Sequence, residues 1–264
     1  MLINSVILVL REVLEAAMVV SLFMAFFTVV RQSHVFLLRA ILLGLIAGAI
    51  YAVNLPTFGN WFGGVGQELM NTLIHAGIYI CLLIFSFLNA AKTTKQSTLL
   101  NACIGLAIVL AISRESAEVM LYVSGFSAMQ SLMLSVITGG LIGLMLGLSV
   151  GVFLYYLMIS LPVNQTRRLI HILIVMVAGS MMAQATQFLI QADWLPATQM
   201  AWDTSAIVSE HSLTGQLLYA LMAYEATPSM LQVVIYLLSL IVMGLAIFIG
   251  CYMQKRANTA YQHG

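Results

Sequence analysis

The chain carries the charged stretch Arg11-Glu12-Val13-Leu14-Glu15 inside an otherwise apolar segment, and Arg114-Glu115-Ser116-Ala117-Glu118 repeats the pattern near the middle of the sequence. Only 7% of the 264 residues are Asp, Glu, Lys or Arg, and six of them lie in these two stretches. An ionisable side chain in the middle of a bilayer costs about 3 kcal/mol on insertion scales. Two such stretches therefore predict a site that handles ions inside a membrane.

The composition places the chain among membrane proteins. It is 62% hydrophobic, with a mean hydropathy of +1.03, which is more apolar surface than a soluble domain of this size can bury. The net charge is +1 and no basic stripe is present, which excludes nucleic acid as a partner. We therefore predict an all-α polytopic membrane protein that lies among membrane lipids.

Apolar runs long enough to cross a bilayer, about 20 residues each, lie near 3–30, 40–58, 69–91, 99–123, 132–161, 169–191 and 231–253. They predict seven transmembrane helices, with a further short apolar stretch at Leu217–Tyr224. Outside the two charged stretches, Lys and Arg occur only in alternate loops and at the C-terminus: Arg31, Arg39, Lys92, Lys95, Arg167, Arg168, Lys255 and Arg256. Because basic loops face the cytoplasm, we expect the N-terminus outside and the C-terminus inside.

The two charged stretches also predict an inverted repeat. Three spans separate them, so their helices run in opposite directions through the membrane, as in many transporters. We expect repeat one at 1–98, repeat two at 99–191, an external loop with a short helix at 192–230, and the seventh span with a short cytoplasmic tail at 231–264. At about 1.5 Å per residue, both arginines lie about 13 to 14 Å from the outer ends of their spans, so the two stretches can face each other. Glycines at Gly44, Gly48 and Gly139–Gly147 have the small-residue spacing that permits close helix packing.

The spacing within each stretch suits a cation. Glu12 and Glu15 share one helix face, and Glu115 and Glu118 repeat that geometry. Two such helices present four carboxylates, whose oxygen atoms select hard cations. We expect Arg11 and Arg114 to hold the empty site together, because four clustered carboxylates would otherwise take up protons, and we expect a trivalent cation to displace them. The alternative is that each Arg–Glu pair only joins helices.

Four other residues are candidates for accessory or uptake roles: Glu68, His75, Asp203 and Glu210. Glu68 and His75 lie on one stripe of the third span, where the histidine is either a ligand or proton relay, or a packing residue. Asp203 is either functional or the cap of a structural corner. Glu210 is either part of an external capture site or a solvated side chain.

The two Arg-Glu-x-x-Glu motifs, in the first and fourth spans, resemble those of the oxidase-dependent iron permease family of fungal plasma membranes and bacterial inner membranes. Trp202-Asp203-Thr204-Ser205 is similar to a segment of that family, as are Gly215, Tyr224, Pro228 and Tyr236. The resemblance implies that Glu12, Glu15, Glu115 and Glu118 are iron ligands, with Arg11 and Arg114 as their motif partners. Members often carry two acidic residues at the head of the third span, where this chain has Glu68 but Asn71.

The resemblance also implies a function. We expect a permease of the bacterial inner membrane, not an enzyme, that imports iron as Fe(III) after an external partner has oxidised Fe(II). That partner would be a periplasmic peroxidase or oxidase acting with an iron-binding protein, and no cofactor would be bound permanently. The alternatives are transport of another cation, such as lead or another divalent metal, and an intramembrane di-metal oxidase, whose sites usually combine Glu with Glu-x-x-His pairs.

Overall fold

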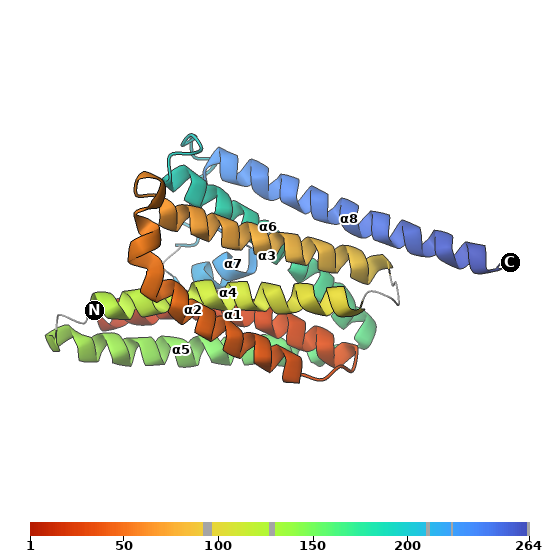
Figure 1. Ribbon diagram of the computed structural model, residues 1–264, viewed down its shortest axis with the longest axis horizontal. Helices are drawn as coiled ribbons and strands as arrows, with labels where there is room; N and C mark the ends of the chain where they lie inside the picture. The colour runs from red at the N-terminus through yellow and green to blue at the C-terminus, as the bar shows by residue number, and fades with distance from the viewer. Residues whose placement is uncertain (92–96, 127–129, 210–211, 223, 263–264) are drawn as a thin grey trace.

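The computed structural model describes residues 1–91, 97–126, 130–209, 212–222 and 224–262 (Figure 1). These ranges contain eight α-helices and one short 3-10 helix, with no β-strand. The elements are α1 (Leu2–Val29), α2 (Val35–Gly59), η1 (Trp61–Gly63), α3 (Gly66–Ala91), α4 (Ser97–Gly125), α5 (Gln130–Ile159), α6 (Val163–Gln191), α7 (Leu213–Met222) and α8 (Met230–Gln262). The all-α prediction is confirmed, and each of the seven expected spans corresponds to one long helix.

Six of the described helices are long and apolar enough to cross a membrane: α2, α3, α4, α5, α6 and α8. The remaining long helix, α1, has 28 residues and carries the first charged stretch. The spanning windows of α2, α5 and α8 are 22%, 22% and 17% buried, against 61% for α6. This difference places α2, α5 and α8 at the periphery of the bundle, where their apolar side chains face lipid. The protein is a multi-pass membrane protein.

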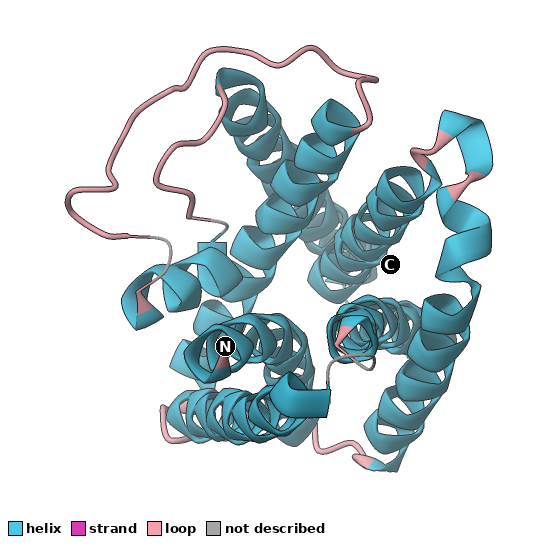
Figure 2. Cartoon of the chain, turned by 90° about the vertical axis from the view of Figure 1, so that its left-hand side faces the viewer, coloured by secondary structure: helices cyan, strands magenta, loops and turns pink. Residues whose placement is uncertain are grey.

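The long helices run side by side in one bundle, seen end-on in Figure 2. α1 packs mainly against α5, α2 against α4, and α3 against α6, while α8 lies on α3 and α6. The rings of Phe23 and Phe85 join α1 to α3, with their centroids 5.4 Å apart in an edge-to-face arrangement. Fully buried Leu14, Ile108 and Ile174 place α1, α4 and α6 around the same core.

Glycine allows the closest of these helix contacts. A Cβ atom added at Gly143 of α5 would lie 2.6 Å from the Val6 carbonyl oxygen of α1, and one at Gly48 of α2 would lie 2.7 Å from the Ser113 carbonyl oxygen of α4. Backbones that approach this closely leave no room for a side chain. The glycines whose spacing predicted close helix packing therefore lie at both the α1–α5 and the α2–α4 interfaces.

The two ends of the bundle differ in charge. Arg31, Arg39, Arg167 and Arg168 flank helix ends at the C-terminal end of the bundle, whereas Glu68, at the start of α3, lies at the opposite end (Figure 1). These basic residues and Glu68 therefore lie at opposite ends of the bundle axis. Lys92, Lys95 and Glu210 lie outside the described residues.

Helix α7 lies alongside the long helices and not beyond their ends. It packs against α1 and α6, and the Arg11 guanidinium lies 5.9 Å from the centre of the Tyr219 ring. Arg11 is about 13 Å along α1 from its first residue. The segment between α6 and α8 therefore folds back to the depth of the first charged stretch.

Candidate functional site

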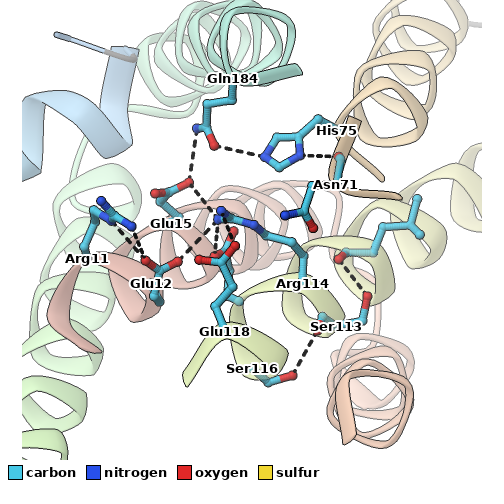
Figure 3. A network of polar contacts seen from close by, with 12 residues as sticks. Arg11, Glu12, Glu15, Asn71, His75, Ser113, Arg114, Ser116, Glu118 and Gln184 are labelled. Carbon is cyan, nitrogen blue, oxygen red and sulfur yellow. Dashed lines mark hydrogen bonds and ion pairs between the residues drawn. The ribbon is translucent and has the colours of Figure 1, made fainter. Parts of the chain in front are cut away.

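The two charged stretches meet at the centre of the bundle, where α1 faces α4 (Figure 3). Arg114 lies between their carboxylates. Its Nη1 atom is 2.6 Å from Glu115 Oε2, 3.3 Å from Glu12 Oε2 and 3.9 Å from Glu15 Oε2, and its Nη2 atom is 2.7 Å from Glu118 Oε1. One guanidinium thus contacts all four glutamates singled out from the sequence.

Most of this cluster is withdrawn from solvent, and only Glu118 among its four glutamates is partly exposed, with 23% of its side chain accessible. Glu12 is 0% exposed, and Glu15, Glu115 and Arg114 are 4 to 5% exposed. Burying an unpaired charge is expensive, and removal of one partner from a buried pair leaves the other uncompensated. The buried glutamates of α1 therefore need Arg114 of α4 to compensate their charge.

Arg11 occupies a different environment from Arg114, although the two arginines hold the same place in their motifs. Its side chain is 42% exposed, and its Nη2 and Nε atoms lie 2.6 and 3.0 Å from Glu12 Oε1. The other face of its guanidinium covers Tyr219 of α7. Glu12 consequently bridges the two arginines, but only Arg114 lies among the carboxylates.

A hydrogen-bonded chain extends from the cluster to α6 and α3 (Figure 3). Gln184 Nε2 donates to Glu15 Oε2 at 3.1 Å, and Gln184 Oε1 lies 2.9 Å from His75 Nε2. His75 Nδ1 lies 2.7 Å from the carbonyl oxygen of Asn71, whose side-chain oxygen accepts from Tyr51. His75 is thus tied indirectly to Glu15 and does not contact the carboxylate itself.

Gln184 is the link between the two ionisable side chains, because its amide contacts Glu15 on one side and His75 on the other. Which ring nitrogen of His75 donates depends on the tautomer of the ring. The contact with the Gln184 amide holds the orientation of the Glu15 carboxylate.

Gln184 is the site residue that the sequence did not single out. Glutamine is common at helix ends and in loops, and nothing in its spacing marks this one. The available signal was its polarity within an apolar span, but Gln187 and Gln191 in the same span share that signal.

The accessory candidates lie apart from the cluster. Glu68, in the first turn of α3, forms no ion pair within the described residues, and its buried Oε2 atom has no hydrogen-bond partner there. Asp203 is exposed and accepts from Ser205 N at 3.0 Å and Ser205 Oγ at 2.6 Å. These hydrogen bonds hold the pKa of Asp203 below its ordinary value. Glu210 lies outside the described residues.

The Trp-Asp-Thr-Ser segment forms a hydrogen-bonded corner. The backbone amides of Ala201 and Thr204 donate to the carbonyl oxygens of Pro228 and Ala226, each at 2.9 Å. The hydroxyl groups of Thr204 and Tyr224 are 2.7 Å apart. These contacts tie the segment after α6 to the segment before α8, which favours the structural interpretation of Asp203.

The Arg114 guanidinium fills the position between the carboxylates. In the part of the chain that the structure describes, no group of three or more His, Cys, Asp or Glu side chains is arranged to hold a metal ion. The cluster is therefore organised around an internal cation, and a metal ion would have to take the place of that cation.

Comparison with known proteins identifies the family. The profile of the Iron permease FTR1 family matches residues 2–263. The chain belongs to this family. The permease is 24% identical over 251 residues to the ferrous iron permease EfeU of Yersinia pestis, a match that covers 88% of each chain. It is 24% identical over 253 residues to EfeU of Escherichia coli O6:H1, covering 89% of this chain and 91% of the relative. No solved structure matches the permease.

The family membership agrees with the resemblance drawn from the two Arg-Glu-x-x-Glu motifs. It identifies the protein as a membrane transporter and supports iron as its cargo. The helices that cross the membrane and the central charged cluster are the parts of the molecule from which a transport mechanism must be built.

Proposed function

We propose that this permease imports iron across the bacterial inner membrane, as Fe(III) formed outside from Fe(II), through Glu12, Glu15, Glu115 and Glu118. The position of Arg114 carries the proposal. A cationic guanidinium lies 2.6 to 3.9 Å from carboxylate oxygens of all four residues, which come from two helices. A site that already holds one cation has the donor atoms and the charge to hold another.

The charge balance favours replacement of Arg114 by a metal cation. With all six groups of the two motifs ionised, four carboxylates outweigh two guanidinium groups. Carboxylate oxygens are hard donors and suit hard cations. Iron would displace the guanidinium from Glu12 and Glu118, while Gln184 continues to hold Glu15 in its orientation. Arg114 would return as the iron leaves, which keeps the four carboxylates compensated between transport events.

We propose α1 as the seventh membrane crossing. Glu12 and Glu15 on this helix face the bundle interior and are 0 and 4% exposed, so they need not contact lipid. With α1 spanning, the basic loops place the N-terminus outside and the C-terminus inside. An inside-negative potential of 100 mV would then supply about 7 kcal/mol for inward movement of a trivalent ion.

We also propose that α1–α3 and α4–α6 form an inverted repeat, and the glycine contacts support it. Gly44 and Gly48 of α2 lie against Val109, Ile112, Ser113 and Ser116 of α4, while Gly143 and Gly147 of α5 lie against Val6, Val9, Leu10 and Val13 of α1. Each of these α4 residues follows its α1 counterpart by 103 positions, as Arg114 follows Arg11. The site would then lie where the two halves meet.

Iron would reach the site from an external partner. An oxidase or peroxidase that converts Fe(II) to Fe(III), together with an iron-binding protein, would deliver the ion to the end of the bundle that carries Glu68. The permease itself would bind no permanent cofactor, and iron would be its transported cargo.

Uptake of radiolabelled iron into proteoliposomes with an imposed inside-negative potential tests the proposal. Glu15→Gln and Glu118→Gln should abolish uptake, because each removes one carboxylate of the cluster. Asp193→Asn is the matched control: it makes the same chemical change at an exposed loop residue with φ of 57°, which Asn also tolerates. Equal uptake by all four proteins would assign the cluster a structural role only. Inhibition of this uptake by unlabelled lead or manganese would show how the permease ranks these metals against iron.

A further inference from the structure

An apolar groove runs along the outside of the bundle between two helix pairs, α1 with α5 and α2 with α4. Its volume is about 760 Å³. The walls are aliphatic, and the floor includes the charged-cluster residues Glu12 and Glu115. The groove therefore runs directly beside the central site, although Glu12 and Glu115 are themselves buried by protein atoms.

The groove opens toward lipid. Its rim residues Leu45, Leu141, Leu148 and Val152 are 44 to 54% exposed, and they belong to the membrane-spanning helices α2 and α5. The lining residues of the groove come from α1 and α5 on one side and from α2 and α4 on the other. Hydrocarbon is thus the medium that meets this face.

One end of the groove carries polar and cationic groups. Tyr155 lines that end, and its hydroxyl lies 3.1 Å from Thr28 Oγ1, which lies 3.5 Å from His34 Nε2. Arg31 follows α1 at the same end, is exposed, and forms no ion pair with the described residues. An apolar groove that ends near an exposed arginine is complementary in polarity and charge to a phospholipid with an anionic headgroup.

We propose that the groove binds one anionic phospholipid, with an acyl chain along α1, α2, α4 and α5 and its phosphate at Arg31 and His34. The acyl chain would pack against the aliphatic walls of the groove, beside the buried Glu12 and Glu115. A zwitterionic lipid of the same chain length would also fill the groove, but it would bind more weakly because it carries no net negative charge to attract Arg31.

Native mass spectrometry of the purified full-length protein tests this inference without any metal. The protein is incubated with equal amounts of phosphatidylglycerol and phosphatidylcholine, and the lipid retained per chain is counted. Wild type should retain phosphatidylglycerol in preference. Arg31→Gln should lower that retention about fivefold, the effect expected for one cation near a lipid headgroup, and Leu148→Trp should abolish it by filling the groove.

Two controls match these variants. Arg168→Gln removes an exposed arginine from the same end of the bundle, and Leu146→Trp enlarges an exposed α5 residue outside the groove. Both should retain phosphatidylglycerol as wild type does.

Equal retention of the two lipids by wild type, or equal losses in the groove variants and their controls, would overturn the proposal. A lipid-free dimer that Leu148→Trp converts to monomer would also overturn it, because a second copy would then fill the groove.

Discussion

Arg114 and Arg11 hold the same place in their motifs but compensate different numbers of charges. Arg114 contacts four carboxylates, whereas Arg11 is half-exposed and, among the described carboxylates, pairs with that of Glu12. Loss of a partner from a buried ion pair costs about 3 to 5 kcal/mol, against about 1 kcal/mol or less for an exposed pair. We therefore expect Arg114→Gln to lower the thermal unfolding midpoint, measured without iron, far more than Arg11→Gln.

The lost stability of Arg114→Gln should be recovered by a cation. Ferric citrate should raise its unfolding midpoint more than that of wild type, because no guanidinium competes for the carboxylates. Adding Glu118→Gln to this variant should weaken the recovery. Similar midpoints for Arg114→Gln and Arg11→Gln would contradict the central role of Arg114.

Gln184 positions Glu15 through one hydrogen bond and His75 through another. A hydrogen bond to a charged group is worth about 1.5 to 3 kcal/mol, which corresponds to a change of about tenfold to a hundredfold in an equilibrium. We expect Gln184→Leu to slow iron uptake within that range. Gln191→Leu, at the exposed end of the same helix, should leave the initial uptake rate unchanged. If both variants transport at the wild-type rate, the chain from Glu15 to His75 does not contribute to transport.

Asp203 gives a prediction about pH. Its pKa is lowered by hydrogen bonds from Ser205, so its ionised form stabilises the corner above the ordinary pKa of an aspartate. That contribution is lost as the pH falls through the lowered pKa. Asp203→Asn keeps an oxygen acceptor for Ser205 but has no charge to lose.

We therefore expect Asp203→Asn to transport iron as wild type does at neutral pH, and Asp203→Ala to transport less. The fluorescence of the neighbouring Trp202 should show an acid transition in wild type that is absent from Asp203→Asn. Loss of uptake in Asp203→Asn with a normal corner would instead indicate a direct role in capturing iron.

The sequence identified the four glutamates because paired carboxylates are rare in apolar helices. It did not distinguish Arg114 from Arg11, since identical spacing within two motifs carries no information about which arginine lies inside. That difference depends on neighbours from other helices, notably Tyr219 of α7 beside Arg11 and Phe188 of α6 beside Arg114. The same limit hid Gln184, whose partners come from α1 and α3.

At the scale of the helices, glycine sets the distance between α1 and α5. A Cβ at Gly143 would lie 2.6 Å from Val6 O and 2.9 Å from Leu10 N, whereas one at Gly140 on the same helix would lie 3.7 Å from its nearest neighbour. Overpacking typically costs about 1 to 3 kcal/mol. We expect Gly143→Ala to lower the unfolding midpoint and the uptake rate together, and Gly140→Ala to change neither.

The proposed repeat extends this prediction to α2. Gly48→Ala should reproduce the defect of Gly143→Ala, because both glycines lie against the helix that carries a charged stretch. A defect confined to one of the two variants would show that the interfaces are not equivalent.

The existence of the long helices was predictable because apolar runs of about 20 residues have few alternatives in a membrane protein. Their ends were less so: α6 begins at Val163 rather than at 169, and α8 ends at Gln262 rather than at 253, because polar residues extend a helix beyond its apolar run. The position of α7 along the bundle axis was not predictable. Its apolar stretch, Leu217–Tyr224, is too short to span and gives no sign of whether it lies outside or folds back. Contact with Arg11, made possible by the tertiary fold, decides its position.

At the scale of the whole molecule, two halves with matching helix contacts enclose one asymmetric site. α1 packs on α5 as α4 packs on α2, yet Arg114 is central and Arg11 is peripheral. In transporters built from inverted repeats, the two halves can exchange conformations as the site opens to the other side of the membrane. For the proposed repeat, this exchange would bring Arg11 among the carboxylates and move Arg114 outward.

This exchange gives a prediction that a static cluster does not make. Arg114→Gln should disfavour the state with Arg114 at the centre, and Arg11→Gln should disfavour the opposite state. A cysteine at Thr72, in the N-terminal half of α3, would report the change once the exposed Cys251 is replaced by serine, because Cys81 and Cys103 are buried. Its labelling rate by a membrane-impermeant maleimide should shift in opposite directions in the two arginine variants. Shifts in the same direction would mean that both arginines stabilise one conformation, and transport would then have to proceed without exchange of the two halves.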